Sequence, residues 1–116
     1  MLKPGTPITS INKATTGAVT TSKNSTKING GGYANCVAYL NVTAASGTSP
    51  TLDVKFQDSA DGTTWYDVPS GAFTQKTATG SQRLALSNVG PYLRAVQTVG
   101  GTTPSFTYDL TIAGVN

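Results

Sequence analysis

Aspartates are the plainest candidates for acid–base chemistry in this chain, because the sequence contains no His and no Glu. Without imidazole, the commonest general base, a common metal ligand and every His-dependent catalytic triad are missing. A glycosidase needs two facing carboxylates, and nothing in the pattern places two aspartates across a cleft. We therefore expect no enzyme, no cofactor and no metal. The aspartates are Asp53, Asp58, Asp61, Asp67 and Asp109.

The sharpest local motif is the segment from Asp58 to Trp65, DSADGTTW. Its two aspartates and its glycine could supply oxygen ligands for calcium, but the segment lacks the spacing and the terminal Glu of an EF-hand loop. Asp-Gly is a strong turn former, so we interpret the segment as a hairpin. We interpret Trp65 as a core anchor that closes one end of the domain, with an exposed stacking platform for a sugar ring as the alternative.

Cys36 is the only cysteine, so no intrachain disulfide can form. It lies in an apolar alternation, which favours a small buried thiol over a nucleophile. No apolar stretch reaches the length of a membrane span, and the first residues lack the apolar centre of a signal peptide. We expect no membrane association, and synthesis and folding in a reducing cytoplasm.

Period-two alternation of apolar side chains predicts about seven short strands between residues 35 and 112, separated by Gly, Pro and Asp turns. Frequent turns between short strands are typical of a β-sandwich. We expect an all-β fold, an antiparallel two-sheet sandwich of the jelly-roll or Ig-like kind, over residues 33–116. The side chains expected between the sheets are Cys36, Leu40, Val42, Leu52, Val54, Phe56, Trp65, Leu84, Leu86, Leu93, Phe106, Leu110 and Ile112.

Residues 1–32 differ from the rest of the chain, because they are rich in Thr, Ser, Asn and Lys and hold no acidic residue. Their apolar content is too low for independent folding, so we expect an extended N-terminal arm ordered by a partner. A few lysines are too small a footprint for a nucleic-acid binder. The arm residues expected to contact the partner are Leu2, Lys3, Ile8, Ile11, Lys13, Val19, Lys23 and Lys27.

Tyrosine is enriched at protein interfaces, because it combines rigid area with a hydrogen-bonding tip. Tyr39 alternates with Leu40, and Tyr66 follows Trp65, so both side chains are candidates for an outward position. We expect these two tyrosines to make surface contacts, with ordinary half-buried tyrosine as the alternative.

Two segments together carry a resemblance: LDVKFQDSADGTTWYDVP, from Leu52 to Pro69, and SNVGPYLRAVQTVGG, from Ser87 to Gly101. A strand that ends in Gln-Asp-Ser before Asp-Gly-Thr and Trp, with a later Pro-Tyr-Leu-Arg strand, resembles small head decoration, or cement, proteins of tailed bacteriophages. The segments cover about a third of the chain. Similar hairpins occur in other sandwich domains, including carbohydrate-binding ones.

The resemblance implies a non-enzymatic structural protein that binds the exterior of a phage capsid and stabilises the head. Its partners would be the major capsid protein and further copies of itself on the capsid lattice, where many weak contacts add up. The arm would tie subunits to the shell, and no catalytic residues are carried over. The alternative is a carbohydrate- or receptor-binding module of a phage tail or surface protein.

Overall fold

The computed structural model describes residues 9–25, 28–29 and 35–115. Their regular structure is β, with one short 3-10 turn, and no helix among them could cross a membrane. All the strands belong to one antiparallel sheet, so the expected all-β antiparallel fold is confirmed. The elements are β1 (Thr9–Asn12), η1 (Ala14–Thr16), β2 (Lys23–Asn24), β3 (Ile28–Asn29), β4 (Asn35–Ser59), β5 (Tyr66–Ala72), β6 (Gly80–Leu86) and β7 (Tyr92–Val115).

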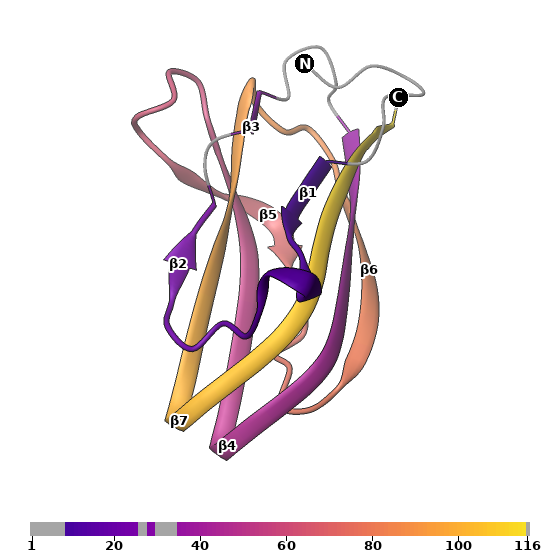
Figure 1. Cartoon of the computed structure of the whole chain (residues 1–116). Helices are drawn as coiled ribbons and strands as arrows, with labels where there is room; N and C mark the ends of the chain where they lie inside the picture. Colours follow the sequence, from indigo (N-terminus) through magenta and orange to yellow (C-terminus); the bar gives the residue numbers. More distant parts are fainter. Residues whose placement is uncertain (1–8, 26–27, 30–34, 116) are drawn as a thin grey trace.

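The central feature is a long ribbon of β4 and β7, which pair from Asn35 opposite Val115 to Ser59 opposite Tyr92. Figure 1 shows both strands turning back near their middle, so that the ribbon folds into two halves. The pairing register shifts at this bend, where Gly47 and Gly101 have φ values of 116° and 105°. Such positive values suit glycine, because other residues carry a Cβ that crowds the backbone.

A division into two separate sheets is not seen, because β4 and β7 keep pairing on both sides of the bend. Inward-facing side chains of the two halves instead share one core, with β5 and β6 added along β4. Alternation along the ribbon produces this core, since successive side chains point to opposite faces of a strand. The buried hydrophobic residues are Val19, Cys36, Val37, Ala38, Leu40, Val42, Leu52, Val54, Phe56, Val68, Phe73, Leu86, Val89, Leu93, Ala95, Phe106, Tyr108, Leu110 and Ile112.

All but two of the side chains predicted for the core belong to this set. Leu84 is only partly buried, although it packs against the core. Trp65 is also partly buried and lies outside the core cluster, so the prediction of a core anchor is wrong. Its actual surroundings belong to the outer face of the sheet and are described below.

The N-terminal residues add strands to the edge of β7. β1 pairs with one half of β7, while β2 and β3 pair with the other half, and a bridge from Val19 to Phe106 lies between them. Val19 is buried, and Ile11 and Ile28 pack against the core. The described N-terminal residues therefore pair with the domain's own sheet at β1, Val19, β2 and β3, and an arm separate from this sheet is not seen among them. The expected domain boundary at 32/33 lies outside the described residues.

Candidate functional site

The two segments that carry the sequence resemblance pack against each other. The backbone N–H of Gly90 donates to Asp58 Oδ2 over 2.9 Å, which joins the first segment to the second. Arg94 Nε donates to Gln57 Oε1 over 2.9 Å, and the Arg94 guanidinium lies 4.5 Å from the centre of the Trp65 ring. Both segments thus form one structural unit in which the motif residues hold the strands together.

Trp65 lies on the outside of the sheet because its partner does. Arg94 alternates with Leu93 and Ala95, which are buried, so the Arg94 side chain must point to the opposite, outer face. The guanidinium covers one face of the indole as a cation–π contact. A tryptophan covered in this way is not a free stacking platform on that face.

Asp61 organises the tip of the hairpin between β4 and β5. Its Oδ1 accepts the backbone N–H groups of Thr63 and Thr64, at 2.8 and 2.9 Å, and the hydroxyl of Ser59 at 2.9 Å. These bonds, above all that from Thr64, hold the pKa of the Asp61 carboxyl well below its usual range. The hairpin interpretation is confirmed by the antiparallel pairing on both sides of this loop.

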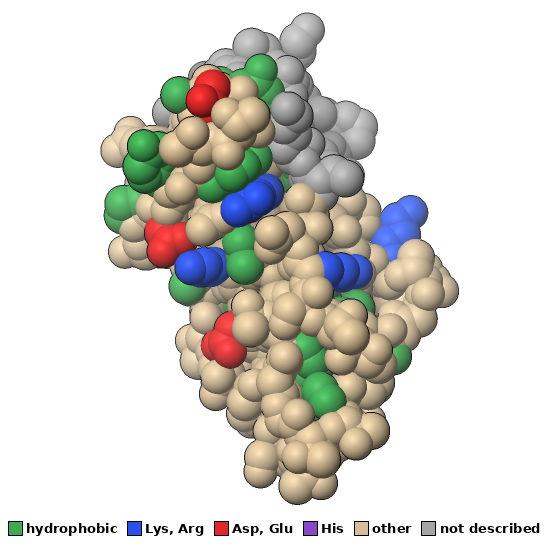
Figure 2. All heavy atoms as spheres, turned by 90° about the vertical axis from the view of Figure 1, so that its left-hand side faces the viewer, with side chains coloured by type: hydrophobic (Ala, Val, Ile, Leu, Met, Phe, Trp, Pro, Cys, Tyr) green, Lys and Arg blue, Asp and Glu red, His purple; other side chains and the backbone are tan. Residues whose placement is uncertain are grey.

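An ion pair lies on the outer face of this half, beside a glutamine that bonds to it. The Asp67 carboxylate lies 3.1 Å from Lys55 Nζ and accepts a hydrogen bond from Gln57 Nε2 over 2.9 Å. The bond from Gln57, and next that from Lys55, lowers the pKa of Asp67. We call this surface, formed by Lys55, Gln57, Trp65, Asp67 and Arg94, the Trp65–Arg94 face. Seen from the side where β2 lies, acidic and basic side chains are interspersed rather than gathered into patches of one sign (Figure 2).

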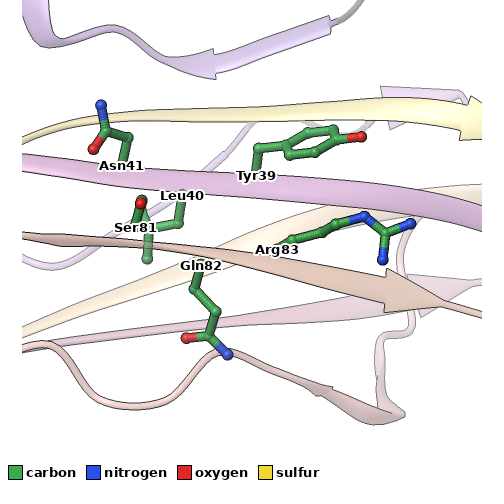
Figure 3. A pocket seen from close by; sticks show the side chains of 6 residues that line it. All are labelled: Tyr39, Leu40, Asn41, Ser81, Gln82 and Arg83. Atoms are coloured by element: carbon green, nitrogen blue, oxygen red, sulfur yellow. The ribbon is translucent and has the colours of Figure 1, made fainter.

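A different surface lies on the other half of the ribbon, where β4 pairs with β6. Tyr39 and Arg83 are opposite each other in the register, and Figure 3 shows their side chains extending in the same direction. With Asn41 and Ser81 they frame a shallow hollow of about 290 Å³, which Leu40 and Gln82 also line. We call this surface, formed by Tyr39, Asn41, Ser81 and Arg83, the Tyr39–Arg83 face.

Polar groups on the Tyr39–Arg83 face have no partners within the described part of the chain. No hydrogen bond or ion pair there involves the side chain of Tyr39, Asn41, Ser81 or Arg83, and Tyr39 is 42 % exposed. The hollow therefore presents a guanidinium, a phenol, an amide and a hydroxyl to solvent. These four side chains together can bind an external partner. They do not place a general base beside a nucleophile, as a reactive site requires.

Residues predicted to contact a partner fall in different places. Tyr39 is exposed as the prediction requires, and Tyr66 is more so, at 65 %, but contact itself stays a prediction. Ile11 and Val19 pack in or against the domain's own core. Lys13 is exposed, and Lys23 Nζ donates to Asn12 Oδ1 over 2.8 Å. Leu2, Lys3, Ile8 and Lys27 lie outside the described residues.

Arg83 is a candidate binding residue that the sequence analysis missed. Its strand was expected from the alternation with Leu84 and Leu86, but nothing local showed that Tyr39 would lie beside it. A second unexpected feature is a buried polar pair, in which the Tyr108 hydroxyl donates to Gln97 Oε1. Both side chains are buried, and desolvation raises the pKa of Tyr108 far above its usual value.

Comparison with known proteins identifies no family. No family model matches the chain, and no curated protein matches it. Among the described residues, no group of three or more acidic or Cys side chains is placed to hold a metal ion.

Proposed function

We propose that this protein is a non-enzymatic structural component of a phage virion, a decoration or cement protein on the capsid exterior. In this role it would bind the major capsid protein and neighbouring copies of itself, and so stabilise the head. Its synthesis would take place in the host cytoplasm. We also propose a more specific architecture, in which the two halves of the bent ribbon act as the two layers of a jelly-roll or Ig-like β-sandwich.

The observation that carries the proposal is the packing of the two motif segments into one unit around Arg94 and Trp65. A motif that recurs in decoration proteins has here a structural role, because its residues bond to one another and are not left free for chemistry. This supports a shared architecture rather than a shared active site. The exposed tyrosines, Tyr39 and Tyr66, supply area for contacts between proteins.

The test is binding to heads. Capsids of the phage whose genome carries this gene would be prepared without the protein, mixed with the purified chain, and sedimented. We expect co-sedimentation, density on the outer surface in cryo-electron microscopy, and a capsid that melts at a higher temperature, since a ligand of the folded state stabilises it. Absence of the chain from sedimented capsids at saturating concentration would refute the role.

One observation favours a second candidate, a carbohydrate-binding module. Tyr66 is the most exposed of the large hydrophobic side chains in the described part, and it adjoins the polar hairpin loop. Aromatic rings at such positions can stack on sugars. A glycan array probed with the wild type and with Tyr66→Ala separates the two functions, since only the carbohydrate module should bind a glycan and lose it in the variant.

A further inference from the structure

In the described part of the chain β6 is an edge strand, because only one of its two sides pairs with another strand. Along Gly80–Leu86 it pairs with β4, and among the described strands it pairs with no other. Figure 1 shows it at the right-hand margin of the molecule, with no further strand beyond it. An edge of this kind exposes backbone N–H and C=O groups that can accept an added strand.

The Tyr39–Arg83 face adjoins that edge. Arg83 belongs to β6 itself, and the Tyr39 ring comes from the neighbouring strand. Backbone groups at the edge and side chains on the face can therefore contact one extended segment at the same time. Tyr and Arg are also the residue types that most often dominate the energy of protein interfaces.

Charge indicates which segment fits. The six residues that line the hollow include one cation, Arg83, and no acid. The nearest acid in the register, Asp109, lies beyond β4 opposite Asn41, and its carboxylate already accepts the N–H of Ala14 over 2.9 Å. A guanidinium that has no partner among the described residues matches a carboxylate in a bidentate arrangement.

We propose that the β6 edge and the Tyr39–Arg83 face together bind an extended acidic segment of a partner protein. The segment adds a strand beside β6, places a carboxylate on Arg83 and packs against Tyr39. This deepens the proposed function and rests on it for the identity of the partner, which would be the capsid protein. In the alternative, the charge of Arg83 only prevents the exposed edge of β6 from pairing with strand edges of other molecules. That alternative predicts no binding of an acidic segment.

The first experiment follows the backbone amides of the full chain by NMR during titration with a blocked octapeptide of alternating threonine and glutamate. We expect shifts concentrated in residues 80–86 and 39–41, and none of that pattern with the peptide in which lysine replaces glutamate. Equal shifts with both peptides, or shifts elsewhere, overturn the inference. Polygalacturonate is titrated in the same way. If it shifts these residues and the acidic peptide does not, the inference is also overturned, because the occupant would be a polysaccharide.

Two variants remove the same single positive charge from the two faces. Arg83→Gln should raise the peptide Kd about tenfold or more, as loss of a central interface arginine does, whereas Lys55→Gln should change it less than about twofold. Both variants should keep the wild-type thermal melt, which shows that each is folded. An equal effect of both variants means that the peptide senses only net charge, and the site is then refuted.

Sedimentation with capsids separates this inference from the proposed function. If the wild type binds capsids and Arg83→Gln binds equally well, the site is wrong while the decoration role stands. If the wild type fails to bind capsids but binds the acidic peptide at β6, the decoration role is wrong while the site stands.

Discussion

Two arginines on the same sheet illustrate two uses of a surface charge. Arg94 donates to Gln57 and covers Trp65, within a face where Lys55 also has its acid, Asp67. Arg83 has no partner within the described part of the chain, although it stands beside an exposed tyrosine. Arg94 and Lys55 already have partners within the protein, so fewer of their N–H groups are available to a binding partner. The charge of Arg83 is available, which is why the binding site is assigned to the Tyr39–Arg83 face.

The bend of the ribbon separates the two faces. Of the substitutions considered, one at a glycine of this bend should have the largest effect on stability. A Cβ on Gly101 would lie 2.6 Å from the carbonyl oxygen of Ser49, at a φ of +105°. Gly101→Ala should lower the free energy of unfolding by about 3 kcal/mol or more, since strain and a backbone clash add. Chemical denaturation measures the change.

Gly17→Ala is the matched control for the bend. Gly17 has a similar φ of +111°, but nothing lies within 4 Å of the position of its Cβ. Only the conformational strain remains, so we expect a loss of about 1–2 kcal/mol. Equal losses at Gly17 and Gly101 would show that the bend is not tightly packed and that the two faces are not rigidly separated.

Substitution of the aromatic residues should have the next largest effect on stability, and that effect should differ between the two faces. Trp65→Ala removes a half-buried ring and its contact with Arg94, so it should cost about 1–2 kcal/mol. Tyr39→Ala should stay within about 0.5 kcal/mol, because the ring is 42 % exposed and has no hydrogen bond in the described part. Urea denaturation curves compare them. A larger loss for Tyr39 would mean that its face is structural and not reserved for a partner.

Sequence patterns could predict much of the core, but not how the surface residues group into two faces. Alternation identified Phe56, Leu93 and Phe106 as buried, because a half-buried strand needs an apolar residue at every second position. The predicted position of Trp65 was wrong. Its neighbour Arg94 is almost thirty residues away in the chain, so a local pattern could not show that the two side chains meet on the outer face. Periodicity also cannot show that β4 and β7 continue through a bend, because a two-residue period is the same in one folded sheet and in two separate ones.

The N-terminal segment shows the same limit. Its low apolar content led us to expect that another surface orders it. Composition cannot identify that surface, however, and Val19 packs into the domain's own core while its backbone pairs with Phe106. Whether the residues before 9 also bind a partner stays a prediction.

The arginines of the two faces give a contrast of similar size, which the fluorescence of the single tryptophan can also report. Arg94→Ala should cost about 1–2 kcal/mol, through the cation–π contact and the bond to Gln57, and should shift the emission of Trp65. Arg83→Ala should leave both stability and emission unchanged, because the Arg83 side chain contacts neither Trp65 nor Gln57. If the two variants shift the fluorescence alike, the cover on Trp65 is not specific to Arg94.

The smallest expected effect concerns Asp67, whose pKa is lowered by the hydrogen bond from Gln57 and then by Lys55. A carboxyl with a lower pKa in the folded state stabilises the fold above its unfolded value of about 3.9, and this stabilisation is lost as the pH falls through the folded pKa. Wild-type stability should therefore fall more steeply below about pH 4 than that of Asp67→Asn. Because the group is exposed, only the difference in slope is expected to be measurable.

Carboxyl-detected NMR titration tests the causes of that shift one by one. Gln57→Ala should bring the pKa of Asp67 further back toward its ordinary value than Lys55→Gln does, since the bond from Gln57 is the larger cause. Arg83→Gln on the other face should leave the titration of Asp67 unchanged, because no contact links the two faces at these residues. An Asp67 that titrates in its usual range in the wild type would mean that the charges of the Trp65–Arg94 face are not held together in solution, and the contrast with Arg83 would then lose its basis.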